Sequence, residues 1–194
     1  MSDKAQRKRQ FIIETARDVF VKKGYRDVTM KDIVEACEIS RGGLYLYFAS
    51  VEEVFLAVLE QEEEKKGMEL TKEKLENCSP SELLLVFLKE QKKEILAGQN
   101  SLAVAKYEYA FVCREEKKPT IFKSEYEKTT LVLARILDKG NAMGEFDCVS
   151  PGEEAGHIMF ALEGLKACAH NMGVSESRVD REILYMMKKI LIEE

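Results

Sequence analysis

Residues 29–48, TMKDIVEACEISRGGLYLYF, decide how the N-terminal part of this chain folds. Thr29 is a residue type that caps helix N-termini, and Asp32 three positions later completes a variant of the capping box. Ser40 is the next start signal, so no more than a turn separates the helix that follows it from the first. The stretch therefore predicts two short helices that meet at a tight corner.

The outward side of the second helix suits the major groove of DNA, because it carries an arginine, backbone amides and two phenols. Arg41 is the candidate for a base contact, since a guanidinium can pair with both acceptors of guanine; clamping a phosphate is the alternative. Tyr45 and Tyr47 are expected to hold phosphate oxygens through their hydroxyl groups. The predicted DNA-contacting residues are Thr29, Lys31, Ser40, Arg41, Gly42, Gly43, Tyr45, Leu46 and Tyr47.

With these residues, the first third of the chain resembles the TetR family of bacterial transcriptional regulators. The resemblance implies a homodimer whose two recognition helices read a palindromic operator in double-stranded DNA. It also implies a larger C-terminal domain that binds a small effector and releases the DNA. The matching residues are Ala16, Phe20, Gly24, Thr29, Asp32, Ile33, Ile39, Ser40, Arg41, Gly42, Leu44, Tyr45, Tyr47, Phe48, Glu52 and Glu53.

Several positions depart from the usual pattern of that family. Glu38 stands where a glycine usually makes the corner, and a left-handed conformation there would cost on the order of 1 kcal/mol. Gly43 can offer only a backbone contact, whereas Leu46 can meet a thymine methyl group. Val51 replaces a common phosphate-binding lysine. We therefore expect weaker affinity or an unusual operator.

The net charge of −5 is divided unevenly along the chain. Residues 1–48 hold ten Lys and Arg against seven Asp and Glu, whereas the remaining 146 residues hold 20 against 28. Positive potential is thus expected where the groove-reading helices lie. Residues 1–9 lack an apolar period and predict an arm that is frayed or ordered only by DNA, whose basic residues either contact phosphates or are only solvated. They are Lys4, Arg7, Lys8 and Arg9.

The composition favours a reduced, cytoplasmic protein. No apolar run is long enough to cross a membrane, and no apolar segment follows the basic start, so neither a membrane span nor a secretion signal is expected. Five cysteines lie far apart without a C-x-x-C pair, which predicts free thiols.

Start and stop signals divide the rest of the chain into helices. Gly140 is predicted to end a long helix that begins at residue 120. With no strand-period segment, the fold class is all-α with about nine helices. We expect a helix-turn-helix DNA-binding domain over residues 1–49 and a helical ligand-binding and dimerisation domain over residues 50–194. Capping boxes are predicted at Ser50, Ser79 and Ser150.

The resemblance implies an effector pocket among the central helices, for which the sequence offers a set of large apolar and aromatic side chains. Such a set at helical spacing is also what a plain core would contain. Walls of this kind would favour an apolar or aromatic effector. The helix after Ser50 would connect this region to the DNA-binding part and transmit the signal. The candidate ligand residues are Phe87, Tyr107, Tyr109, Phe111, Phe122, Tyr126, Met143 and Phe160.

The last two helices each carry an apolar stripe, which suits a four-helix bundle between two subunits. Packing of both stripes within one chain is the alternative. The candidate dimer contacts are Ile158, Leu162, Leu165, Ala169, Ile183, Met187 and Ile190.

Catalytic and metal sites find no support in the sequence. His157 and His170 lie 13 residues apart, away from the spacing that places two ligands on one helix face. No G-x-S-x-G, P-loop or H-E-x-x-H motif occurs, so we expect no enzyme, metal or cofactor. The alternative function is a helical small-molecule carrier or protein-interaction module without specific DNA binding.

Overall fold

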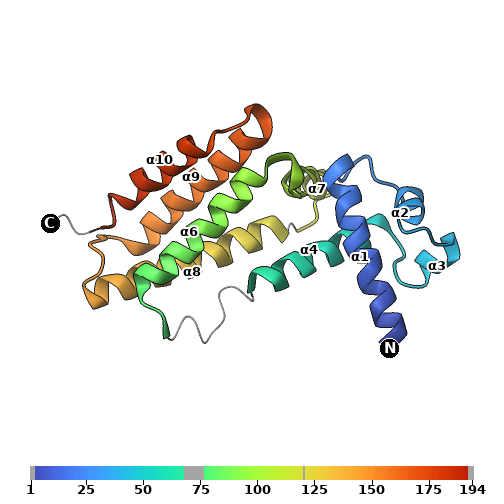
Figure 1. Cartoon of the computed structure of the whole chain (residues 1–194), viewed down its shortest axis with the longest axis horizontal. Helices are drawn as coiled ribbons and strands as arrows, with labels where there is room; N and C mark the ends of the chain where they lie inside the picture. Colours follow the sequence, from blue (N-terminus) through green and yellow to red (C-terminus); the bar gives the residue numbers. More distant parts are fainter. Residues whose placement is uncertain (1–2, 68–76, 120, 192–194) are drawn as a thin grey trace. The chain divides into compact units, whose positions relative to one another are not determined.

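The computed structural model describes residues 3–67, 77–119 and 121–191 of the chain (Figure 1). In these ranges it contains nine α-helices and no β-strand, which confirms the all-α fold class. None of these helices is both long and apolar enough to span a bilayer.

The chain forms two compact units that interleave along the sequence. Unit 1 consists of Met1–Glu69 and Gln99–Pro119, and unit 2 consists of Leu70–Gly98 and Thr120–Glu194. A segment from the middle of the chain therefore packs with the N-terminal helices. The two packed units are divided at other positions than residues 49 and 50. The functional boundary expected there stays a prediction.

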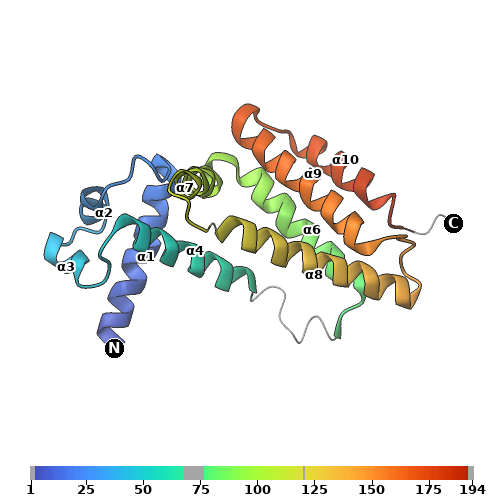
Figure 2. The same ribbon diagram turned by 180° about the vertical axis from the view of Figure 1, so that it is seen from behind.

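Unit 1 contains the two short helices and three longer ones. They are α1 (Asp3–Lys23), α2 (Met30–Ala36), α3 (Arg41–Tyr45), α4 (Val51–Gly67) and α7 (Ala103–Glu115). Helix α1 packs against α2, α4 and α7, as both views of the ribbon show (Figures 1 and 2).

An aromatic cluster in the core of unit 1 includes a residue of α7. The ring centroids of Phe20 and Phe55 lie 4.8 Å apart, and that of Tyr25 lies 4.9 Å from both Phe55 and Tyr109. Each such pair contributes about 0.5–1.5 kcal/mol beyond its area burial. Because Tyr109 belongs to α7, this helix completes the hydrophobic core of the N-terminal helices.

Helix α1 begins earlier than the sequence predicted. The expected frayed arm over residues 1–9 is wrong for residues 3–9, which are helical. Alanine, lysine, arginine and glutamine are good helix formers even without an apolar stripe. Arg7 also forms an ion pair with Asp3 one turn before it. The basic residues are thus carried on a regular helix.

Unit 2 is built from four helices, and α6 contacts the other three. Leu84, Leu133 and Leu162 are completely buried in its core. The four helices are α6 (Pro80–Ala97), α8 (Ile121–Met143), α9 (Pro151–Met172) and α10 (Glu176–Met187), as seen in Figure 2.

Helix α8 continues past the glycine that was predicted to end it. Gly140 lies inside the helix, and a Cβ atom there would overlap the ring of Phe146. This glycine is therefore needed for close approach of the following loop. Gly144, with a φ of 71°, follows the helix end instead.

The capping box predicted at Ser79 is complete, because Ser79 caps α6 with its hydroxyl while Glu82 returns the bond. At Ser50 half of the predicted box is present: the backbone N–H of Glu53 donates to Ser50 Oγ over 3.1 Å, but the Glu53 carboxylate accepts from the N–H of Ala49 over 2.7 Å. The box predicted at Ser150 is wrong, because its side chain makes no cap hydrogen bond and its backbone ψ is 87°. Cap geometry requires an extended ψ that the sequence does not reveal.

Candidate nucleic-acid interface

The N-terminus of α2 is fixed by a complete capping box. The backbone N–H of Asp32 donates to Thr29 Oγ1 over 3.3 Å, and the N–H of Thr29 donates to the Asp32 carboxylate over 2.8 Å. Lys23 at the end of α1 donates to the same carboxylate over 2.6 Å. The hydrogen bond from Lys23, followed by that from Thr29, holds the pKa of Asp32 well below its usual range. Helix α2 is therefore tied to the end of α1.

The corner between α2 and α3 has a left-handed residue where the family resemblance implies a glycine. Glu38 has a φ of 51°, and the next N–H, of Ile39, donates to the carbonyl of Val34 over 3.2 Å. This hydrogen bond satisfies a carbonyl that the end of α2 would otherwise leave without a partner. A non-glycine residue thus closes the corner at a cost in backbone strain.

Helix α3 presents its polar side to solvent. Ser40 caps it by accepting a hydrogen bond of 3.1 Å from the N–H of Gly43. Leu44 is fully buried beneath, whereas Leu46 is 82 % exposed. The guanidinium of Arg41 lies 5.6 Å from the ring centroid of Tyr45, and both side chains are exposed. Arginine and tyrosine therefore share one accessible face.

The two glycines of α3 differ in their surroundings. A Cβ atom on Gly42 would meet nothing within 4 Å, so the backbone is open to an approaching ligand there. A Cβ atom on Gly43 would lie 3.1 Å from Ser40 Oγ, the atom that caps the helix. Gly43 thus leaves room for the capping hydroxyl.

Lys31 in α2 is exposed, and its ammonium group forms a 3.6 Å ion pair with Glu35.

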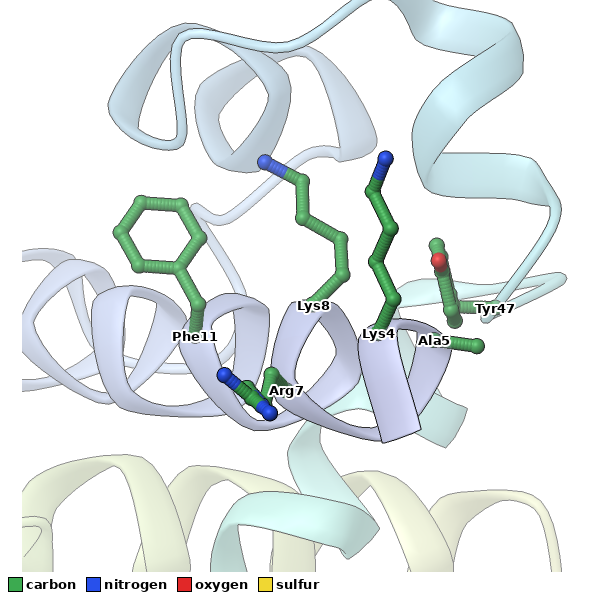
Figure 3. Close-up of a pocket in the computed structure, with 6 residues that line it drawn as sticks. All are labelled: Lys4, Ala5, Arg7, Lys8, Phe11 and Tyr47. Carbon is green, nitrogen blue, oxygen red and sulfur yellow. The ribbon is translucent and has the colours of Figure 1, made fainter. Parts of the chain in front are cut away.

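A basic groove of about 610 Å³ lies along the start of α1 (Figure 3). The ammonium group of Lys8 lies 4.8 Å from the centroid of the Phe11 ring, which is 44 % exposed. Lys4 and Lys8 extend from α1 in the same direction, and Tyr47 lies on the side of Lys4. The lining residues are Lys4, Ala5, Arg7, Lys8, Phe11 and Tyr47.

The groove joins two sets of residues that the sequence treated separately. Basic residues of the predicted arm and Tyr47 of the predicted reading face line one surface. Sequence reasoning missed Ala5 here, and it also missed Phe11. Its position directly before the buried pair Ile12 and Ile13 was the available signal, since three successive residues cannot all face one core.

The candidate ligand residues are divided between the two units. Tyr107, Tyr109 and Phe111 lie on α7 in unit 1, and the other five lie in unit 2. Tyr109 belongs to the core of unit 1, where its hydroxyl donates to Glu52 over 3.0 Å. Tyr109 therefore has the core role that was the alternative to a ligand contact.

In unit 2 the remaining candidates also differ in exposure. Phe87 is buried, whereas Phe160 is 74 % and Met143 58 % exposed. The rings of Tyr126 and Phe160 are in contact, with centroids 5.9 Å apart. Phe122 is half-buried and makes interactions of its own. The predicted ligand contacts of these five residues stay a prediction.

Two buried polar atoms of unit 2 have no hydrogen-bond partner among the described residues. They are Gln91 Oε1 on α6 and the hydroxyl of Tyr126 on α8. The side chain of Gln91 lies on the core side of α6, and the residue is only 8 % exposed. Sequence reasoning missed Gln91, although it was the polar residue in register with an apolar stripe.

Three of the predicted dimer contacts are corrected. Ile158, Leu162 and Ile190 are at most 2 % exposed, because they pack in the core of their own protomer. Leu165, Ala169, Ile183 and Met187 are half-buried against the same core. The exposed apolar side chains on these helices are instead Phe160, Met172, Leu184 and Tyr185.

Within the ranges that the structure describes, no group of three or more His, Cys, Asp or Glu side chains could hold a metal ion.

The organised feature of unit 1 is the capped pair of short helices with an accessible arginine. These features define the class of helix-turn-helix DNA-binding regulators.

Comparison with known proteins gives the family. Residues 12–58 match the model for "Bacterial regulatory proteins, tetR family", and residues 83–180 match "Tetracyclin repressor-like, C-terminal domain". The chain therefore belongs to the TetR family of transcriptional regulators.

Individual relatives and structures agree with this assignment. The chain is 33 % identical over 145 residues to the uncharacterised regulator YfiR of Bacillus subtilis (strain 168), covering 72 % of this chain and 68 % of YfiR. It is 26 % identical to the regulator QacR of Staphylococcus aureus, covering 85 % of this chain and 87 % of QacR. A transcriptional regulator from Saccharomonospora viridis in complex with choline has the same fold, with a TM-score of 0.81, 17 % identity and coverage of 97 % and 100 %.

Proposed function

We propose that this protein is a ligand-responsive repressor that binds a palindromic operator as a homodimer. The observation that carries the proposal is the capped helix pair of unit 1, whose outer face presents Arg41 and Leu46. An arginine can read guanine in the major groove, and an aliphatic side chain can pack on a thymine methyl group. Release by an effector follows the two-site coupling in which operator and effector weaken each other's binding equally.

The basic groove on α1 supplies the contacts that do not depend on sequence. Lys4 and Lys8 bring two ammonium groups to the same groove as Tyr47, a geometry suited to a DNA backbone phosphate. Thr29 and Lys31 at the start of α2 are proposed to hold a further phosphate. Binding should then fall steeply as salt rises, because each neutralised phosphate releases counterions.

The proposed dimer surface lies on α9 and α10. Phe160, Leu184 and Tyr185 are 74 %, 61 % and 64 % exposed, which is costly for side chains of this size in a monomer. A Cβ atom on Gly156 or Gly164 of α9 would meet nothing within 4 Å, so a second helix could approach closely. The half-buried Leu165, Ala169, Ile183 and Met187 would support this surface from below.

The proposed effector site involves Gln91 and Tyr126 of unit 2. Each has a buried polar atom without a partner among the described residues, and such atoms cost free energy until they are paired. The hydroxyl of Tyr126 can donate, and Gln91 Oε1 can accept. Together with the ring of Phe160, they suit a small, largely apolar or aromatic compound with at least one hydrogen-bonding group.

The decisive test of DNA binding is selection of fragments from a random duplex pool. The unaltered protein should enrich a palindrome, and Arg41→Ala should weaken binding to it about 10- to 100-fold. Arg114→Ala is the matched control, since Arg114 is also an exposed arginine of unit 1 and carries the same charge. Enrichment of no sequence by the unaltered protein would reject the proposal and favour a carrier or protein-interaction module.

The dimer and the effector are tested separately. Light scattering should give a dimer for the unaltered protein and a monomer for the double variant Leu184→Glu, Tyr185→Glu, whereas Val149→Glu, at a fully exposed position outside this surface, should stay dimeric.

Thermal-shift screening should use choline and a panel of neutral aromatic compounds. A true effector should lose its shift in Gln91→Leu and should weaken operator binding by the unaltered protein.

A further inference from the structure

A carboxylate on α7 accepts two backbone hydrogen bonds from residues that follow α1. Glu108 accepts the backbone N–H of Tyr25 over 2.5 Å and that of Arg26 over 3.0 Å. These two amides begin the connection from α1 to α2, and more than 80 residues of sequence separate them from Glu108. The charged carboxylate therefore fixes the path of the chain as it enters the reading helices.

Gly24 allows this contact. Its φ is 78°, a conformation that side chains rarely adopt, and a Cβ atom at this position would collide with the Glu108 carboxylate. Gly24 is thus both the left-handed end of α1 and the space into which Glu108 fits.

A second contact joins α7 to the start of α4. The hydroxyl of Tyr109 donates to Glu52 over 3.0 Å, and Lys118 just after α7 contacts the same carboxylate over 3.2 Å. Burial, followed by hydrogen bonds to Cys113 and Glu52, raises the pKa of the Tyr109 hydroxyl, so it stays a neutral donor. A third contact is the 2.7 Å ion pair between Arg26 and Glu115.

We propose that Glu108 and Tyr109 are positioning residues for DNA recognition, which hold the α1–α2 connection and the start of α4 in the arrangement that places α3. The inference rests on the proposed function. In the sequence, α7 is flanked on both sides by segments of unit 2, which end at Gly98 and resume at Thr120. It is therefore a second covalent connection between the unit that we propose to bind the effector and the unit that carries α3. The sequence alone offered only α4 for that role.

The test compares Glu108→Gln with Glu127→Gln, an exposed control in α8 that changes the net charge equally. Removing a negative charge by itself should strengthen binding to DNA, so the positioning role predicts the opposite sign. Glu108→Gln should bind the selected operator at least about 10-fold more weakly than Glu127→Gln. The slope of log K against log salt should be unchanged, because no phosphate contact is lost.

Hydrogen exchange gives a readout that needs no operator. In Glu108→Gln, the amides of Tyr25 and Arg26 and those of the α2–α3 corner should exchange faster than in Glu127→Gln. Tyr109→Phe, which keeps the ring in the core, should give a smaller change of the same sign and serves if Glu108→Gln fails to fold.

The outcomes separate this inference from the proposed function. If the unaltered protein selects no operator, the proposed function fails, and exchange at the α2–α3 corner still decides whether Glu108 orders it. Unchanged exchange at that corner, or operator binding by Glu108→Gln as tight as by Glu127→Gln, overturns the positioning role.

Discussion

Unit 1 and unit 2 differ in how they treat buried polar groups. In the described part of unit 1, buried polar side chains are partnered, as in the bond from Tyr109 to Glu52. Unit 2 buries Gln91 Oε1 and the hydroxyl of Tyr126 without partners, and exposes Phe160 on α9. Under the proposed function, the difference has a physical reason: a surface that reads DNA binds best when it is ordered in advance, whereas a unit that binds an effector and a second subunit keeps groups that they can satisfy.

The largest expected effect separates two phenylalanines, one in each unit. Phe55→Ala removes a ring that is fully buried among the aromatic side chains of unit 1 and should cost about 3–5 kcal/mol of folding free energy. Phe160→Ala, at a 74 % exposed position, should change the stability of the protomer by less than about 0.5 kcal/mol. Urea unfolding followed by circular dichroism measures both, and equal losses would contradict the comparison.

Two tyrosines should respond with opposite signs. Tyr109→Phe deletes a hydroxyl bonded to a carboxylate and should destabilise the protein by about 1.5 kcal/mol. Tyr126→Phe deletes an unpartnered buried hydroxyl and should stabilise it by up to about 1 kcal/mol in the absence of effector. Thermal unfolding of the two variants measures both changes in stability. A destabilised Tyr126→Phe would mean that the Tyr126 hydroxyl has a hydrogen-bond partner in solution.

Acid should weaken a capping box in each unit. The pKa of Asp32 in unit 1 is lowered by Lys23 and Thr29, and that of Glu82 in unit 2 is lowered by the backbone N–H and hydroxyl of Ser79. A lowered folded-state pKa gives stability that is present above the unfolded value of about 4 and is lost as pH falls below it. Asp32→Asn should reduce the acid dependence of unfolding more than Glu82→Gln does, since Asp32 also has the lysine partner. The stability of each variant between pH 7 and pH 3 tests this order.

The smallest expected effect concerns backbone strain. Among the described residues, the non-glycine positions with positive φ, Glu38 and Lys117, lie in unit 1, whereas such positions in unit 2 are glycines, including Gly173. Glu38→Gly should stabilise the protein by about 0.5 kcal/mol, because relief of strain exceeds the entropy that glycine gains on unfolding. Gly173→Ala is the control and should destabilise it by about 1 kcal/mol. A destabilised Glu38→Gly would show that the glutamate side chain contributes more than its backbone costs.

Local signals in the sequence were sufficient for most of the fold. The capping box at Thr29 and the cap at Ser40 were predicted, because each depends on residues within one turn of one another. The early start of α1 was missed, since a polar helix has no apolar period to announce it. The cap at Ser150 failed because its backbone geometry is set by the surrounding loop.

The candidate sites were less predictable wherever they depend on which side of a helix is covered. Ile158 and Leu184 are both large and apolar on the last two long helices, yet one is buried and the other 61 % exposed. Periodicity identifies a stripe but not the neighbour that covers it.

The sequence by itself determined the helices, the helix-turn-helix and the family, because caps, turns and apolar periods act over a few residues. Only the tertiary structure decided that α7 belongs to unit 1, that Glu108 accepts the backbone amides that follow α1, and that Gln91 and Tyr126 bury unpartnered atoms. These features join residues far apart in the chain, and their free energy depends on burial and on hydrogen-bond geometry that exists only once the helices are packed.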